Sequence, residues 1–149
     1  MFLYFYDKFT LETIFSHILL GTNIKGLITY ASVGAQKLLT YMPQELIGRM
    51  VLTQTIDTSD LLHRSHEIES ETGKVLPADF TVMTFKTIFT RGNEETRVWN
   101  MIRKDRTMAA VRLTTRPLND DGGVFGFVFY GKEIQEAVAP TANSPVLNQ

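Results

Sequence analysis

The sequence predicts an α+β protein built on an antiparallel sheet. Between residues 97 and 134, three apolar runs are separated by two turn signals, which is typical of a three-stranded antiparallel meander. Between residues 18 and 49, two short strands around a tight turn precede two short helices. With 149 residues, of which 44% are hydrophobic, the chain is long enough for one compact domain with a substantial core.

The first 17 residues are expected to form an amphipathic helix ahead of this domain. Four apolar residues recur at helical spacing at the end of this segment and just beyond it: Leu11, Ile14, Phe15 and Ile18. The apolar start of the chain lacks a basic leading segment and is cut short by Asp7 and Lys8, so we expect neither a signal peptide nor a membrane span, and a cytoplasmic location. The predicted organisation is a flanking helix, a domain, and an exit segment with a flexible tail: residues 1–17, 18–134 and 135–149.

The domain is predicted to begin with two strands, residues 18–23 and 27–32, around a glycine turn. Ser32 is well placed to cap a helix over residues 33–39. Pro43 suits the first position of a one-turn helix, which the next glycine ends.

The middle of the chain, residues 52–80, is predicted to contain a longer helix that Gly73 ends. Leu61, Leu62, Ser65 and Ile68 repeat at helical spacing, and the outer face is expected to carry three carboxylates: Glu67, Glu69 and Glu71. Residues 81–89 are rich in apolar side chains and are predicted to be a strand or an extended connection.

The meander has turns at residues 104–107 and 119–123. Its middle strand alternates cleanly between two sets of side chains, Ala109, Val111, Leu113 and Thr115 against Met108, Arg112, Thr114 and Arg116. A half-buried sheet is therefore expected.

Two stretches of the sequence resemble the PAS domain family. The family pattern G-x-I-x-Y-x-N-x-A-A-E-x-L-L-G-Y-x-x-E-E-L-I-G is similar to the stretch from Gly26-Leu27-Ile28-Thr29-Tyr30 to Gly48. The later pattern E-W-x-x-x-R-K-D-G, with its following strands, is similar to the stretch from Trp99-Asn100-Met101-Ile102-Arg103-Lys104-Asp105 to Gly126. The departures are Ser32 for Asn, Thr40 for Gly, Val98 for Glu and Arg106 for the glycine of the turn.

The resemblance implies the PAS fold: a five-stranded antiparallel sheet with short helices on one face and an N-terminal flanking helix. It also implies a sensory role in signal transduction. The long middle connection is similar to the bacterial subgroup that precedes histidine kinases and diguanylate cyclases, including those of two-component systems.

PAS domains hold small molecules between the sheet and the helices, so the resemblance implies a pocket there. The candidate lining residues are Leu62, Met83, Phe85, Trp99, Met101, Val111, Leu113 and Phe127. The alternative is a filled core without a cavity, for which ten phenylalanines and one tryptophan provide the volume.

His63 and His66 lie three residues apart on the predicted helix. Haem-binding PAS domains take their proximal histidine from this helix near the position of His63, so haem is one alternative. A metal site from His63 and His66 lacks a third ligand at a recognisable spacing, and His17 is expected at a strand edge. The chain has no cysteine, which excludes the covalent flavin adduct of blue-light PAS domains.

The last strand, residues 124–130, is apolar on both faces, with Val128 and Tyr130 opposite its phenylalanines. Either the chain's own N-terminal helix covers the outer face, or two copies pack together as a homodimer, as PAS domains often do. The candidate interface residues are Phe5, Phe9, Leu11, Ile14, Phe15, Val128 and Tyr130.

The net charge of −1 gives no reason to expect nucleic acid as a partner. No phosphate loop, nucleophile elbow or zinc-protease motif is present, so no catalysis is predicted. The prediction is a sensory domain that binds a small molecule or a partner and relays the change through its terminal helices and dimer interface. The alternatives are a haem-based gas or redox sensor using His63, and a ligand-free interaction or dimerisation module.

Overall fold

The computed structural model describes residues 17–89 and 94–134. Five strands form one antiparallel sheet in the order β2-β1-β5-β4-β3. The elements follow one another as β1 (Ile18–Asn23), β2 (Ile28–Ala31), α2 (Val33–Leu39), α3 (Pro43–Leu46), the 3₁₀ helix η2 (Leu52–Thr55), α4 (Thr58–Thr72), α5 (Phe80–Phe89), β3 (Glu95–Ile102), β4 (Met108–Asp120) and β5 (Gly123–Glu133). The predicted flanking helix of residues 1–17 lies outside the described residues, apart from His17.

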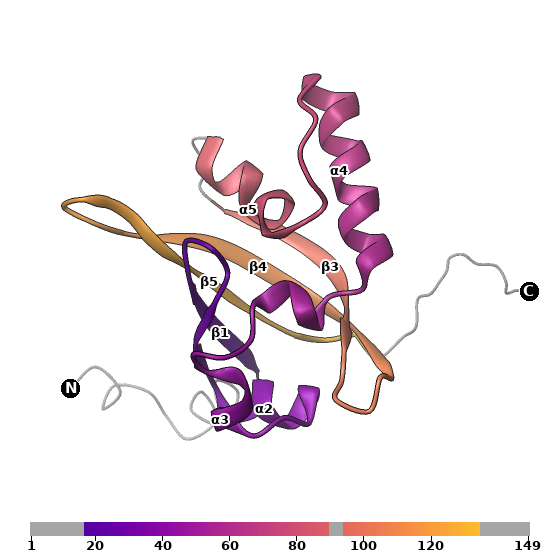
Figure 1. Ribbon diagram of the computed structural model, residues 1–149, viewed down its shortest axis with the longest axis vertical. Helices are drawn as coiled ribbons and strands as arrows, with labels where there is room; N and C mark the ends of the chain where they lie inside the picture. Colours follow the sequence, from indigo (N-terminus) through magenta and orange to yellow (C-terminus); the bar gives the residue numbers. More distant parts are fainter. Residues whose placement is uncertain (1–16, 90–93, 135–149) are drawn as a thin grey trace, which may run out of the picture.

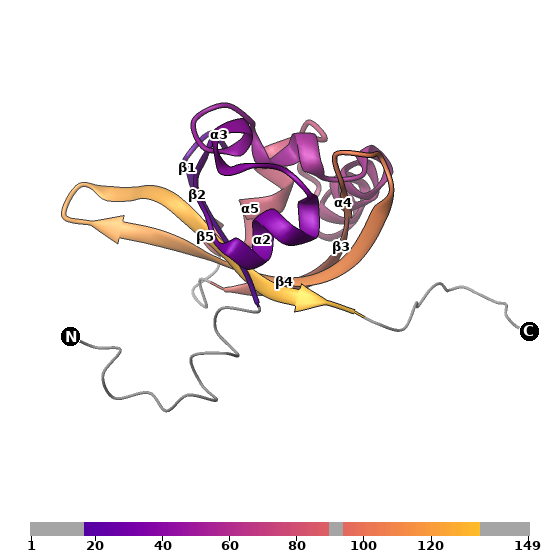
Figure 2. The same cartoon turned by 90° about the horizontal axis from the view of Figure 1, so that it is seen from below.

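All the labelled helices lie on one side of the sheet, as Figure 1 and Figure 2 show. The predicted five-stranded antiparallel sheet with helices on one face is thus confirmed. The β4–β5 hairpin is longer than its neighbours, and its tip projects beyond the helical layer (Figure 2). The inner face of the sheet and the helices enclose the core.

The turn between β1 and β2 is held by Asn23, whose side-chain oxygen accepts hydrogen bonds from the backbone N–H groups of Lys25 (2.9 Å) and Leu27 (3.0 Å). Gly26 in this turn has a φ of +93°. The ring of Phe80 packs directly against it, so that a Cβ at this position would lie 2.8 Å from the ring. Both the backbone angle and the close contact therefore require glycine.

The predicted helix over residues 33–39 is confirmed as α2, with Ser32 as its cap. The Ser32 hydroxyl accepts a hydrogen bond from the Ala35 N–H at 3.2 Å. α4 ends at Gly73, whose φ of +80° suits a left-handed helix end, as predicted.

The predicted strand over residues 81–89 is wrong, because these residues belong to helix α5. Most of its side chains are buried, so its helical period is hidden, and periodicity alone does not distinguish such a run from a strand. Its threonines are accommodated inside the helix. The Thr87 hydroxyl donates to the Thr84 carbonyl at 2.8 Å, and the Thr84 hydroxyl donates to the Phe80 carbonyl at 3.4 Å.

The meander follows the predicted facing. Trp99 pairs with Val111 and Met101 with Ala109 across β3 and β4, and all four side chains are buried. The turn between these strands places Arg106 at a φ of +75°, which is the glycine-like position at which the sequence departs from the family pattern.

Glu45 and Lys104 form an ion pair between α3 and this turn, with 2.7 Å between the carboxylate oxygen and Nζ. The hydrogen bond from Lys104 lowers the pKa of Glu45. Both side chains are partly exposed, so the pair makes little difference to stability.

Candidate functional site

The residues predicted to line an interior pocket are mostly brought together. Seven of them are buried in one cluster between the sheet and the helices: Met83, Phe85, Trp99, Met101, Val111, Leu113 and Phe127. Phe80 joins this cluster and packs against two other phenylalanine rings. The ring of Phe80 lies edge-on to Phe127 at 5.7 Å and tilted against Phe129 at 5.9 Å. Ligand binding among these side chains stays a prediction.

Leu62 was assigned to the same pocket, and this assignment is wrong. Its side chain is 48% exposed, whereas the preceding Leu61 is buried. Successive residues on a helix point about 100° apart, so only one of two neighbouring leucines can face the core.

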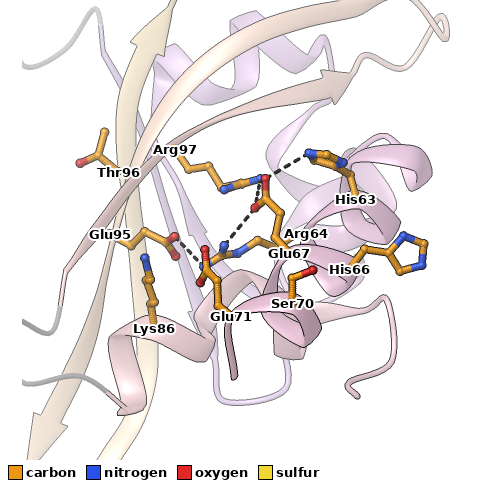
Figure 3. A pocket seen from close by; sticks show the side chains of 10 residues that line it. All are labelled: His63, Arg64, His66, Glu67, Ser70, Glu71, Lys86, Glu95, Thr96 and Arg97. Atoms are coloured by element: carbon orange, nitrogen blue, oxygen red, sulfur yellow. Dashed lines mark hydrogen bonds and ion pairs between the residues drawn. The ribbon is translucent and has the colours of Figure 1, made fainter. Parts of the chain in front are cut away.

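A polar hollow of about 610 Å³ lies beside this core, between α4, α5 and the start of β3. Figure 3 shows its side chains, which are almost all charged or hydrogen-bonding. The lining residues are His63, Arg64, His66, Glu67, Ser70, Glu71, Lys86, Glu95, Thr96 and Arg97. None of the predicted pocket residues is among them.

Arg64 anchors the hollow. Its side chain is only 2% exposed, which is unusual for a charged residue. Two of its nitrogens are paired with carboxylates, Nη1 with Glu67 at 3.1 Å and Nη2 with Glu95 at 2.8 Å. Its Nε is buried and has no hydrogen-bond partner among the described residues. The guanidinium thus ties helix α4 to strand β3, and its Nε–H group is a donor that no described residue uses.

Glu67 occupies the centre of Figure 3, where three basic side chains converge on it. Its carboxylate oxygens lie 3.1 Å from Arg64, 2.8 Å from Arg97 and 3.0 Å from His63. Burial by itself would raise the pKa of Glu67. The hydrogen bond from Arg64 and the charges of Arg97 and His63 outweigh that effect and lower the pKa. Glu67 was predicted to lie on the outer face of α4. It is instead half-buried and pairs with three basic side chains.

Arg97 connects the hollow with the apolar core. Its guanidinium carbon lies 5.3 Å from the centre of the Trp99 ring, which is a cation–π distance. Arg97 and Trp99 are two residues apart on β3 and share one face of the strand. A displacement of the Arg97 side chain would therefore change the contacts of Trp99, which belongs to the core.

The sequence contained a signal for this cluster that the prediction did not use. Arg64 follows Leu61 by three residues and precedes Ile68 by four, so it falls within the buried stripe of α4. An arginine in such a stripe requires carboxylate partners from neighbouring elements. Glu95 on β3 supplies one of these carboxylates. It lies 31 residues from Arg64 in the sequence, so no local pattern links the two.

The histidines do not face the core. His63 is 71% exposed and pairs with Glu67, and His66 is exposed and points away from the cluster in Figure 3. His63 thus lies away from the core, and haem ligation by His63 stays a prediction. Within the described ranges, no group of three His, Cys, Asp or Glu side chains is arranged to hold a metal ion. His17 is half-buried and directly precedes β1, which lies between β2 and β5 in the sheet.

The outer face of the sheet carries no helix of the described chain (Figure 2). Tyr130 on β5 pairs with Leu19 of β1 on one side and Thr114 of β4 on the other. Tyr130 is 37% exposed, and Leu19 and Val128 are half-buried. A mainly apolar hollow of about 440 Å³ lies here, with Arg112 and Lys132 among its lining residues.

Five of the predicted interface residues lie outside the described residues: Phe5, Phe9, Leu11, Ile14 and Phe15. Val128 and Tyr130 lie on the outer face as predicted. Among the helices that the structure describes, none is sufficiently long and apolar to cross a membrane.

The structure is similar to several solved PAS domains. The PAS domain of a protein from Colwellia psychrerythraea has a TM-score of 0.60 at 16% identity, covering 86% of this chain and 98% of that one. A PAS domain from a two-component sensor histidine kinase has a TM-score of 0.54 at 19% identity, covering 85% and 95%. A light-oxygen-voltage domain has a TM-score of 0.56 at 19% identity, covering 85% and 83%.

No family model and no curated protein matches the sequence. The assignment therefore depends on the element order, the sheet order β2-β1-β5-β4-β3 and the similarity of the whole structure to these domains. Taken together, these observations establish that the chain has the PAS fold.

Proposed function

We propose that the protein is a sensory signal-transduction module that relays the binding of a small molecule or a partner through a homodimer formed on the outer face of its sheet. The observation that carries this proposal is the apolar strip on that face. A half-exposed antiparallel sheet normally presents polar side chains to water. Here Leu19, Val128 and Tyr130 lie on strands β1 and β5, which are central to the sheet.

The strip is bordered by Arg112, Arg116 and Lys132, which are exposed. An apolar centre with a charged rim is typical of a protein interface. We propose that a second copy of the chain covers the strip, with the residue 1–17 segments contributing apolar side chains to the contact. The competing arrangement is coverage by the chain's own N-terminal helix.

The input is proposed to act on the core between the sheet and the helices. Met83 and Met101 are buried there, and methionine is the side chain that adapts most readily to a changed neighbour. A small molecule or a bound partner would shift the population between two packings of this core. We propose a module without catalytic activity, whose terminal segments, residues 1–17 and 135–149, pass the change on.

The similarity to the PAS domain of a sensor histidine kinase supports an effector of that kind, or a diguanylate cyclase, as the downstream partner. A bacterial, cytoplasmic two-component system is the setting that we propose. Haem sensing through His63 is disfavoured because that side chain is 71% exposed and pairs with Glu67 outside the core. A ligand-free dimerisation module is the second candidate, favoured by the aromatic rings that pack together in the core.

Light scattering on the full chain, coupled to size-exclusion chromatography, tests the dimer. We expect a mass near twice the 16.9 kDa of one chain. Tyr130→Glu places a charge in the strip and should yield monomers. Val75→Glu is the matched control, because Val75 is 75% exposed in a loop away from the sheet, and it should leave the dimer intact.

A monomeric wild type, or a Tyr130→Glu variant that still dimerises, would overturn the proposed interface. Native mass spectrometry and an absorbance spectrum of the protein, expressed with haem supplied, then separate the two candidates for the input. A retained small mass identifies a ligand, whereas a clean dimer without one favours the ligand-free module.

A further inference from the structure

We propose that the polar hollow between α4, α5 and β3 is a binding site for a small zwitterion, a molecule such as a free amino acid that carries both a carboxylate and an ammonium group. This site is separate from the interior core and from the outer face of the sheet. The inference does not depend on the proposed dimer.

The first argument concerns the unused donor of Arg64. Its guanidinium is buried, and burying a charge without full pairing is costly. Two of its nitrogens are paired with Glu67 and Glu95, but its buried Nε has no partner in the described part of the chain. An incoming carboxylate oxygen is the acceptor that best satisfies an arginine donor.

The second argument concerns the balance of charge. Three carboxylates, Glu67, Glu71 and Glu95, and three basic side chains, Arg64, Arg97 and Lys86, line the hollow. A simple anion or a simple cation would disturb this balance. A zwitterion preserves it, because each of its charges meets an opposite one.

The third argument concerns which carboxylate is available. Glu67 already pairs with three basic side chains, and Glu95 pairs with Arg64. Glu71 is exposed, and no hydrogen bond or ion pair engages it among the described residues. Glu71 is thus the group that would accept an ammonium, while Arg64 and Arg97 hold the carboxylate of the same molecule.

The size of the hollow agrees with this assignment. Its volume of about 610 Å³ lies within the range of small-molecule sites, roughly 300–1,000 Å³. A free amino acid would leave room for bridging water, which polar sites commonly retain. Through Arg97, which lies 5.3 Å from the Trp99 ring, occupancy would also reach the apolar core.

The test is thermal unfolding of the full chain with each of the twenty standard amino acids, followed by calorimetric titration of those that raise the midpoint. We expect at least one to bind. Its deaminated analogue, which lacks the ammonium, and its methyl ester, which lacks the carboxylate, should each bind about tenfold more weakly or worse, the cost of one lost charged hydrogen bond.

Single substitutions test whether the amino acid binds in the hollow. Glu71→Gln and Arg97→Gln should each weaken it by about tenfold or more. Glu69→Gln is the matched control, since Glu69 is exposed on the same helix but does not line the hollow, and it should bind like wild type. Circular dichroism establishes that each variant is folded.

Three results would overturn the proposal. The first is that no amino acid shifts the midpoint at millimolar concentration. The second is binding that Glu71→Gln and Arg97→Gln leave unchanged, which would place it elsewhere. The third is equal binding of the deaminated analogue, which would make the hollow a simple anion site.

Discussion

The seam between helix α4 and strand β3 has an apolar half and an ionic half, and the two are built by different rules. Along one face of β3, Glu95 and Arg97 come first and Trp99 and Met101 follow. The second pair is buried among apolar side chains, whereas the first pair binds Arg64 and Glu67 of α4. One strand face therefore changes its chemistry within a few residues.

The comparison separates two sources of stability, which are packing in the apolar half and ion pairing in the ionic half. The apolar half gains free energy in proportion to the area removed from water and tolerates changes that conserve volume. The ion pairs of the ionic half contribute little net free energy, because the cost of desolvating the charges offsets their attraction. Removing one partner is costly, however, because the other charge is then buried without compensation. The apolar half should thus dominate stability, while the ionic half fixes how α4 is docked.

The largest effect is expected from Trp99→Ala in the apolar half. Trp99 is 2% exposed, and truncating such a side chain should reduce the free energy of unfolding by about 3–5 kcal/mol. Urea denaturation of the full chain measures this loss. Val98→Ala is the neighbouring control, since Val98 is 44% exposed on the opposite face and should cost no more than about 0.5 kcal/mol. A Trp99→Ala loss below about 1 kcal/mol would contradict the assigned facing of β3.

A smaller effect is expected from Glu95→Ala in the ionic half. This change removes the carboxylate that lies 2.8 Å from Arg64 and leaves the buried guanidinium with one partner. The expected loss is about 1.5–3 kcal/mol, the usual range for a hydrogen bond to a charged group. Glu94→Ala, at the exposed position just before the strand, should have almost no effect. Equal losses for the two variants would show that the buried pair does not dock α4.

The smallest effect is expected from Glu67 and depends on pH. Because the folded state lowers the pKa of Glu67 from its ordinary value of 4.5, its pairing stabilises the fold above that pH. The contribution is lost as the pH falls through the lowered value. The stability difference between wild type and Glu67→Gln should be about 1 kcal/mol at neutral pH and shrink in acid.

Urea denaturation at a series of pH values measures this difference. Glu69→Gln provides the baseline, because Glu69 is exposed and lies outside the cluster. A difference that stays constant down to the acid limb would mean that Glu67 is not preferentially ionised in the folded protein.

The apolar half could be predicted from the sequence because alternation specifies facing. The positions of Trp99, Val111 and Leu113 followed from the two-residue period of the meander, and all three are buried. The ionic half could not be predicted in the same way. Glu95 and Arg64 are 31 residues apart, and nothing local to either one identifies the other.

The error at α5 has a related cause. A short run that is apolar on nearly every side has no visible period, so its composition favoured an extended chain. The helix is docked on the core, where it buries Val82 and Met83 completely. Local propensity was overridden by packing.

The long β4–β5 hairpin has a kinetic consequence. In the described chain, β3 pairs with β4 no further than Thr115, and β1 pairs with β5 no further than Gly126. Beyond those residues the two strands have only each other, and Phe125 is 52% exposed. Backbone amides near the tip should therefore exchange with deuterium through local opening, while those around Leu113 should exchange only when the whole domain unfolds. The two ends of one continuous hairpin should therefore exchange their amide hydrogens at very different rates.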